Sequence, residues 1–126
     1  MTLTVLLVDD SKSSRTVNFA YLFSVLGADM KCLEAMRGDQ AIALLETEQI
    51  DLVLLDLTMP GMSGFDVLAE MRTRDMKVPV VVISADVQRQ TRERVVALGA
   101  VGFLEKPLRP EALANMLALL EVGHVG

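Results

Sequence analysis

Five short apolar runs, separated by longer segments in which apolar residues recur at helical spacing, constrain the fold of this chain more than any other feature. The runs cover residues 3–8, 30–33, 52–55, 80–83 and 101–104. Strands that are apolar on both faces and separated by helices are typical of a parallel sheet covered on both sides, with right-handed crossovers. The alternation therefore predicts a doubly wound α/β domain with a five-stranded parallel sheet and five helices.

The segments between the runs carry the helical pattern, most clearly in the first and the last. Apolar residues stand there at i, i+3, i+4 and i+7, as Phe19, Leu22, Phe23 and Leu26, and again as Leu113, Met116, Leu117 and Leu120. This spacing places each set on one side of a helix, so we expect each to be the face that packs on the sheet. Shorter sets predict the other three helices: Ala41, Leu44 and Leu45; Phe65, Leu68 and Ala69; and Val87, Thr91, Val95 and Leu98.

Capping residues agree with these segments. Gly27 and Gly99 stand where helix C-caps are expected, and Ser63 with Asp66 has the spacing of an N-terminal capping box. Pro110 suits a first helical turn.

Length and composition indicate one self-folding domain. The chain has 126 residues, of which 52% are hydrophobic and 23% charged. We assign residues 1–121 to the domain and expect residues 122–126, with the lone His124, to form a flexible tail. The single cysteine, Cys32, excludes an internal disulfide and a multi-cysteine metal site, and we expect it to be a small buried side chain.

The same composition argues against two classes of partner. A net charge of −5 provides no basic surface for a nucleic acid backbone. The apolar runs are too short to span a membrane, and the first residues lack the basic start of a signal peptide. We therefore expect a cytoplasmic protein that acts on other proteins.

Polar residues follow the apolar runs at the places where a doubly wound sheet binds its ligands, outside the carboxyl ends of the strands. Asp9 and Asp10 end the first run, Asp56 the third and Ser84 the fourth, while Lys106 stands two residues beyond the fifth. We expect these five side chains to converge.

Three converging carboxylates would repel one another unless a cation offset their charge. Oxygen ligands without a nearby histidine or cysteine favour a hard ion, and Mg²⁺ fits best because it accepts few carboxylates and keeps several waters. A carboxylate beside Mg²⁺ and a lysine can attack a phosphoryl group in line. The expected product is an aspartyl phosphate.

At this point the sequence resembles the receiver domain of response regulators in two-component signalling. The resemblance rests on motifs in the expected order along nearly the whole chain: Val8-Asp9-Asp10, the segment from Leu55-Asp56 to Ser63-Gly64, Ser84-Ala85, and the segment from Gly99 to Lys106-Pro107. It implies the flavodoxin-like strand order 2-1-3-4-5.

The resemblance implies a role for each residue of the acidic cluster. Asp56 would be the phosphoacceptor, supplied by a phosphohistidine on a sensor kinase or phosphotransfer protein, or by a small acyl phosphate. Asp10 would bind Mg²⁺ directly and Asp9 through water, with a carboxylate oxygen of Asp56 and the backbone carbonyl of Thr58 completing the protein ligands. Asp9 and Asp10 could instead simply cap the first helix.

The resemblance also implies a switch. Lys106 would pair with the acidic cluster and then with the phosphoryl group, and the Lys106-Pro107 peptide would be cis. Ser84 would bind a phosphoryl oxygen while Phe103 moves inward, which would reshape the surface of the fourth helix, fifth strand and fifth helix. Ser84 and Phe103 replace the threonine and tyrosine of many relatives, and ordinary core packing is the alternative role of Phe103.

Several alternatives stay open, and others lack their motifs. The chain could be a stand-alone receiver of the chemotaxis type, a receiver module of a longer regulator, or an interaction module that needs no phosphorylation. Val101 and Gly102 replace the acidic pair of winged-helix regulators, which argues against their dimer interface. A phosphatase of the haloacid dehalogenase type would need an aspartate at Thr58, and a flavodoxin-like cofactor binder would need a phosphate-binding loop where Asp9 and Asp10 stand.

We expect no enzymatic activity beyond self-phosphorylation and self-dephosphorylation. The further partners that we expect are an unknown output protein and a possible phosphatase.

Overall fold

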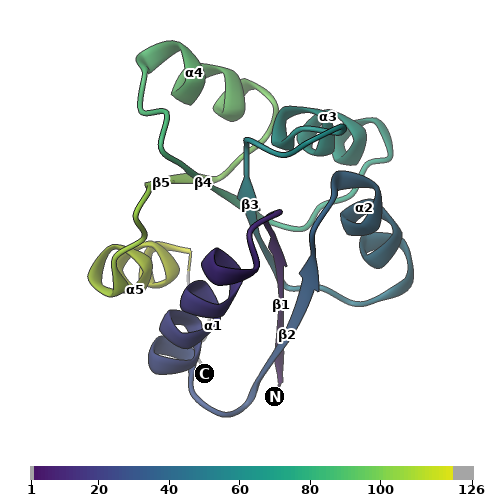
Figure 1. Ribbon diagram of the computed structural model, residues 1–126. Coiled ribbons are helices and arrows are strands. Elements are labelled where there is room, and N and C mark those ends of the chain that lie inside the picture. Colours follow the sequence, from purple (N-terminus) through teal and green to yellow (C-terminus); the bar gives the residue numbers. More distant parts are fainter. Residues whose placement is uncertain (1, 121–126) are drawn as a thin grey trace.

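The computed structural model describes residues 2–120, in which five strands alternate with five helices (Figure 1). The strands are β1 (Leu3–Val8), β2 (Met30–Ala35), β3 (Leu52–Asp56), β4 (Val80–Ser84) and β5 (Gly102–Glu105). The helices are α1 (Lys12–Leu26), α2 (Gly38–Thr47), α3 (Gly64–Thr73), α4 (Arg89–Ala97) and α5 (Pro110–Leu119). All strand pairs are parallel and the order is β2-β1-β3-β4-β5, so the predicted fold class and strand order are confirmed.

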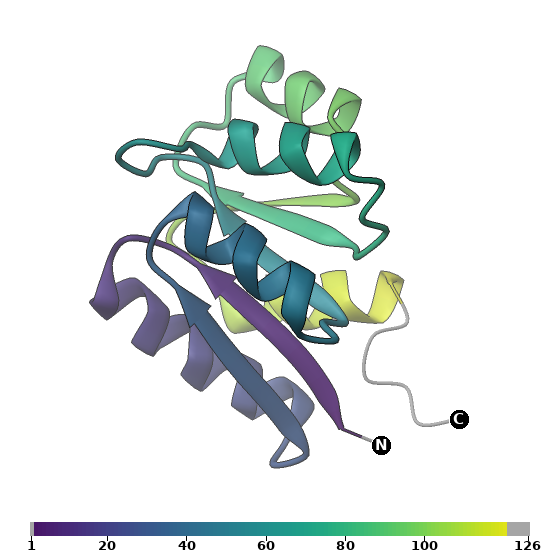
Figure 2. The ribbon, with the colours of Figure 1, turned by 90° about the vertical axis from the view of Figure 1, so that its right-hand side faces the viewer.

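The sheet separates two apolar cores, and the two ribbon views show helices on both of its faces (Figures 1 and 2). Helices α1 and α5 cover one face, and α2, α3 and α4 cover the other. Every residue of β3 and β4 is buried, which explains why these two runs are apolar on both faces.

The strands extend beyond the apolar runs at their carboxyl ends. Asp56 is the last residue of β3 and Ser84 the last of β4, and both side chains are buried. β5 begins at Gly102, because Val101 is exposed and joins no strand. The polar residues that end the runs thus belong to the sheet itself.

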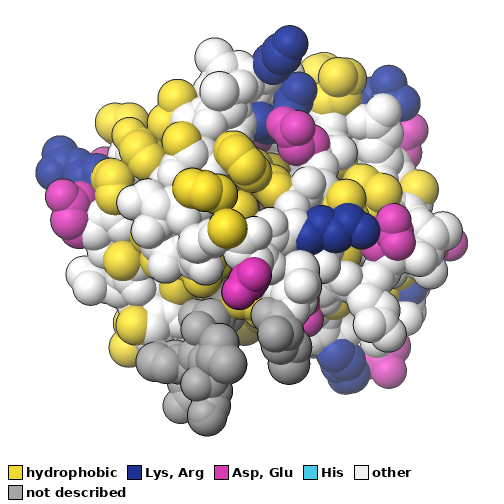
Figure 3. Space-filling model, turned by 90° about the horizontal axis from the view of Figure 1, so that it is seen from below, with side chains coloured by type: hydrophobic (Ala, Val, Ile, Leu, Met, Phe, Trp, Pro, Cys, Tyr) yellow, Lys and Arg dark blue, Asp and Glu magenta, His cyan; other side chains and the backbone are white. Residues whose placement is uncertain are grey.

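The predicted apolar face of α1 is wrong in part. Leu22 is fully buried, but Phe19 and Phe23 are 42% and 50% exposed. The side of α1 that faces the sheet is instead formed by Arg15, Asn18 and Leu22, two of which are polar. Figure 3 shows exposed apolar side chains on the face of the molecule that is seen from below.

The other helices follow their predicted patterns more closely. In α5, Leu113 and Leu117 are buried, and Met116 and Leu120 pack against the same core. In α4, Thr91 and Val95 are buried, whereas Val87 precedes the helix and is exposed.

The capping predictions agree with the structure. Ser63 and Asp66 form a capping box at α3, and Pro110 lies in the first turn of α5. Gly27 caps α1 at φ 82°, and Gly99 follows the last turn of α4 at φ 103°, conformations that favour glycine.

Two further sequence predictions concern the C-terminal tail and membrane-spanning segments. The tail predicted at residues 122–126, with His124, lies outside the described residues. Within the described residues, no helix is long and apolar enough to cross a membrane.

Candidate functional site

Three carboxylates meet at the carboxyl ends of β1 and β3. Asp9 and Asp56 are only 4% and 5% exposed, whereas Asp10 is exposed. Each of the three offers an oxygen that lies within 4.8 Å of the others. This convergence was predicted from the sequence, and it creates a strongly anionic pocket where the strand order reverses between β1 and β3.

Lys106 supplies the positive charge of this pocket. Its Nζ lies 3.4 Å from Asp9 Oδ2 and 3.3 Å from Asp56 Oδ1, so one ammonium group bridges two buried carboxylates. Lys106 follows β5, and its backbone N–H donates to the carbonyl of Ser84 at 2.9 Å, which fixes the loop that carries it. The Lys106-Pro107 peptide bond is cis.

The pKa of the Asp56 carboxyl is raised above its ordinary value. Burial is the main cause and the negative charge of Asp9 adds to it, while Lys106 and the backbone N–H of Thr58 act in the opposite direction. A cation placed among the carboxylates would favour the ionised form of Asp56 further.

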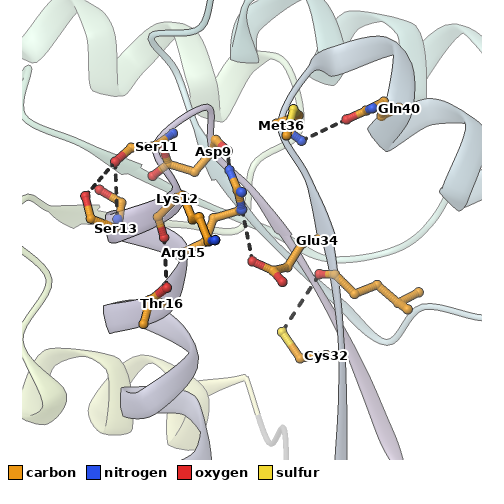
Figure 4. Close-up of polar contacts among 12 residues, drawn as sticks. Asp9, Ser11, Lys12, Ser13, Arg15, Thr16, Cys32, Glu34, Met36 and Gln40 are labelled. Atoms are coloured by element: carbon orange, nitrogen blue, oxygen red, sulfur yellow. Dashed lines mark hydrogen bonds and ion pairs between the residues drawn. The ribbon is translucent and has the colours of Figure 1, made fainter.

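The β1–α1 loop shows what Asp9 does at the start of α1. Ser11 is the N-cap of this helix, and its hydroxyl accepts the N–H of Ser14. Asp9 Oδ1 accepts the N–H of Ser11 at 2.9 Å, so it binds the N-cap residue and not an N–H of the first helical turn; Figure 4 shows Asp9 and Ser11. The alternative in which Asp9 or Asp10 caps α1 is therefore wrong.

The loop after Asp56 requires a glycine at position 64. Gly64 donates its N–H to the carbonyl of Leu57 at 3.0 Å and begins α3. A Cβ on this residue would stand 2.5 Å from the carbonyl oxygen of Asp56 and 2.7 Å from Leu57 Cα. Because the chain at Gly64 passes this close to Asp56 and Leu57, it holds the end of β3 in place. Thr58 is exposed on this loop, with its N–H 3.4 Å from Asp56 Oδ1, and the role of its carbonyl stays a prediction.

Ser84 is tied to the first turn of α4 through Asp86. The Ser84 hydroxyl accepts the N–H of Asp86 at 3.0 Å, and Asp86 Oδ2 accepts the hydroxyl of Thr91 at 2.7 Å. Asp86 Oδ1 accepts the N–H of Gln88, and the hydrogen bonds from Thr91 and Gln88 hold the pKa of Asp86 below its ordinary value. The sequence did not reveal this connection.

Phe103 also contacts the first turn of α4. It is half-buried on β5 against the core on the α4 face, and the guanidinium of Arg92 lies 5.0 Å from its ring centroid. A second arginine of α4, Arg94, lies 3.9 Å over the ring of Phe65. Adjacent residues of α4, Thr91 and Arg92, thus connect to both predicted switch residues.

A functional candidate that sequence reasoning missed is Arg15. Its side chain is buried on α1, where it donates from Nη1 to the backbone carbonyl of Asp9 at 2.7 Å and from Nε to Glu34 at 2.9 Å (Figure 4). An arginine four residues before Phe19, where the expected apolar pattern begins, gives no sign of burial, so only the fold reveals it.

The fold and the site together define a doubly wound domain with an acidic, lysine-paired pocket at the carboxyl edge of its sheet. The chain belongs to the response regulator receiver domain family, whose model matches residues 5–118. It is thus a receiver domain of two-component signalling, as the sequence motifs indicated.

Relatives from bacteria place the chain among response regulators. It is 34% identical over 113 residues to the probable C4-dicarboxylate response regulator DctR of Bacillus subtilis, covering 90% of this chain and 50% of that protein. It is also 34% identical over 127 residues to the nitrate/nitrite response regulator protein NarL of Escherichia coli, covering 97% of this chain and 56% of that protein. The chain spans about half the length of these relatives.

Solved structures resemble the whole described fold. The chemotaxis protein CheY4 of Vibrio cholerae matches with a TM-score of 0.84 at 28% identity, covering 94% of this chain and 98% of that one. The signal receiver domain of a putative LuxO repressor protein from Vibrio parahaemolyticus matches with a TM-score of 0.86 at 30% identity, covering 94% of this chain and 89% of that one.

Proposed function

We propose that this receiver domain accepts a phosphoryl group on Asp56, in the presence of Mg²⁺, and that the modified domain controls a protein partner through its α4-β5-α5 surface. The observation that carries the proposal is the position of Asp56, buried at the end of β3 between Asp9 and Lys106. A buried carboxylate with a raised pKa beside a fixed cation is typical of a reactive group.

The transfer needs a nucleophilic oxygen and a leaving group. An oxygen of Asp56 forms the new bond to phosphorus while the bond from phosphorus to the donor breaks, releasing a histidine side chain of a sensor kinase or phosphotransfer protein. With a small acyl phosphate, the carboxylate of that molecule leaves instead. Lys106, 3.3 Å from Asp56 Oδ1, is close enough to stabilise the added phosphoryl charge.

The residues of the pocket fit Mg²⁺. Three carboxylates whose oxygens lie within 4.8 Å of one another form a set of hard oxygen donors, and the repulsion among them calls for a cation. Asp9, Asp10 and Asp56, with the carbonyl of Thr58, would hold the ion. When bound, Mg²⁺ would offset the carboxylate charge and polarise the phosphoryl oxygens.

The change in the α4-β5-α5 surface would start at Ser84. Its hydroxyl now accepts the Asp86 N–H, and a phosphoryl group on Asp56 would offer it a new acceptor. Movement of Ser84 would displace Asp86 and with it Thr91 in the first turn of α4. Since Arg92 covers Phe103, the same turn would also release the switch aromatic. Such a change needs to bias an existing equilibrium by only a few kcal/mol.

The proposed partners follow from this chemistry: a sensor kinase or phosphotransfer protein as donor, an output protein, and a phosphatase that limits the lifetime of the acyl phosphate. The domain would have no enzymatic activity beyond its own phosphorylation and dephosphorylation. The cytoplasmic location stays a prediction.

The proposal is tested by incubating the protein with acetyl phosphate and Mg²⁺ and following its intact mass. We expect a Mg²⁺-dependent gain of one phosphoryl group that is lost in Asp56→Asn. Asp51→Asn, an exposed aspartate at the opposite end of β3, is the matched control and should keep the adduct. Absence of an adduct with acetyl phosphate and of any response to beryllofluoride would refute phosphorylation and leave an interaction module as the function.

A further inference from the structure

The buried guanidinium of Arg15 carries an inference that rests on the proposed function. Arg15 is 7% exposed, in the second turn of α1. Because removing a charge from water costs several kcal/mol, a buried arginine persists where its charge and hydrogen bonds are matched. Arg15 has one matched contact to the carboxylate of Glu34 on β2 and one to the backbone of Asp9.

The contact to Asp9 engages the peptide group that joins Asp9 to Asp10. Arg15 Nη1 donates to the Asp9 carbonyl at 2.7 Å, a short charge-assisted hydrogen bond in a buried place (Figure 4). This bond fixes the plane of the peptide from which Asp10 leaves the end of β1.

Asp9 and Asp10 differ in how they are held. Asp9 donates its N–H to the Ala35 carbonyl, and its two carboxylate oxygens accept from Ser11 and Lys106. Within residues 2–120, no hydrogen bond or ion pair fixes the exposed Asp10 carboxylate. The direction of Asp10 is therefore set by its backbone.

We propose that Arg15 is a positioning residue, which holds the Asp9–Asp10 peptide so that the Asp10 carboxylate points into the metal site. Glu34 completes the arrangement by holding Nε of Arg15 at 2.9 Å, so a chain of contacts runs from the edge strand β2 to the pocket. Groups that orient metal ligands in this way typically change metal affinity by about 10- to 100-fold when they are removed.

The direction in which Mg²⁺ affinity changes on removing Arg15 distinguishes a positioning role from an effect of its charge. Arg15 is a cation near an anionic pocket, so through its charge alone it would oppose Mg²⁺, and its removal would tighten binding. Through positioning, its removal would weaken binding. Arg15→Met removes both the charge and the hydrogen bonds and therefore distinguishes the two.

The test is Mg²⁺ binding by isothermal titration calorimetry without a phosphodonor. We expect Arg15→Met to raise the Kd for Mg²⁺ about 10-fold or more. Arg15→Gln, which can still donate to the Asp9 carbonyl, should recover part of this loss. Arg89→Met removes an exposed arginine paired with Glu93 on α4 and should leave the Kd unchanged.

Results that overturn the role of Arg15 differ from results that refute the proposed function. A folded Arg15→Met protein with wild-type or tighter Mg²⁺ binding overturns the inference, as does a lower melting temperature with an unchanged Kd. If Arg15→Met does not fold, Arg15→Gln decides by the same comparison. Failure of the wild type to bind Mg²⁺ and to form the Asp56 adduct would instead refute the proposed function.

Discussion

Helices α1 and α4 both begin at the carboxyl edge of the sheet, on opposite faces, but different contacts hold the two helices. On the acidic side, which comprises Asp9, Asp10 and α1, the buried Arg15 and Asn18 lie against the sheet and Tyr21 and Val25 pack against the core shared with α5. On the switch side, which comprises Ser84, α4 and Phe103, only Thr91 and Val95 of the helix are buried.

This difference assigns the two sides different tasks. The acidic side is fixed by the ion pair of the buried Arg15 with Glu34 and by hydrogen bonds to every polar group of Asp9. On the switch side, the hydrogen bonds of Asp86 with Ser84, Gln88 and Thr91 and the contact of Arg92 with Phe103 lie in a loop and the first turn of α4, where contacts can be exchanged at little cost. We infer that the acidic side presents the reactive groups in one geometry while the switch side changes.

The largest predicted effect concerns Gly64, where the chain passes close to the end of β3. Gly64→Ala should destabilise folding by about 3 kcal/mol, because its Cβ would meet the Asp56 carbonyl oxygen and Leu57 Cα at 2.5 and 2.7 Å. Gly61→Ala meets no atom within 4 Å, and its positive φ should cost only about 1 kcal/mol. Urea unfolding of both variants measures the difference; equal losses would show that the return of the chain at Gly64 is not tightly packed.

The next effect concerns the lysine that bridges Asp9 and Asp56. Lys106→Met should slow phosphorylation by acetyl phosphate about 10- to 100-fold, since hydrogen bonds to charged groups contribute about 1.5–3 kcal/mol. Lys77→Met removes an exposed lysine paired with Asp75 and should not alter the rate. A wild-type rate in Lys106→Met would show that the ammonium group does not stabilise the transferred phosphoryl group.

A smaller effect is expected on the switch side. Thr91→Val removes the hydroxyl that holds Asp86 and should favour the changed arrangement, so that beryllofluoride binds about 5-fold more tightly, equivalent to about 1 kcal/mol. Thr73→Val, which removes a similar hydroxyl on α3, is the control. Weaker binding in Thr91→Val would mean that this contact supports the phosphorylated arrangement instead.

The smallest effect is expected at Cys32, whose alkylation rate should not change when beryllofluoride is added. This half-buried thiol lies on β2 against the core of the α1 face, and burial, with a smaller contribution from Glu34, raises its pKa to about 11. The folded thiol therefore stays protonated at pH 8, and its titration should lower folding stability as pH rises from 9.0 toward about 11. Alkylation by iodoacetamide at pH 8 should be slow with or without beryllofluoride. An accelerated reaction on adding beryllofluoride would show that the core that Cys32 shares with α1 has loosened, which would contradict a fixed acidic side.

Much of this site could be predicted from the sequence. The order of the apolar runs places their carboxyl ends at one edge of a parallel sheet, which brings Asp9, Asp56 and Lys106 together. The strand ends were predicted too early, because Asp56 and Ser84 are polar residues that belong to buried strands.

The remaining features depend on contacts that apolar spacing does not encode. The pattern pointed to Phe19 and Phe23 on α1, but the helix buries the polar Arg15 and Asn18 instead, and the guanidinium of Arg15 reaches the backbone carbonyl of Asp9 beyond the end of β1. The contact from Asp86 to Thr91 depends on the conformation of the β4–α4 loop, which no residue pattern specifies.

The central claim is that modification of Asp56 changes the switch side and leaves the acidic side in place. Backbone amide hydrogen exchange, measured by NMR with Mg²⁺ before and after adding beryllofluoride, tests it most directly. The account predicts altered exchange from Ser84 through α4 to Phe103 and unchanged exchange in α1. Equal changes in α1 and α4, or changes confined to α1, would contradict it.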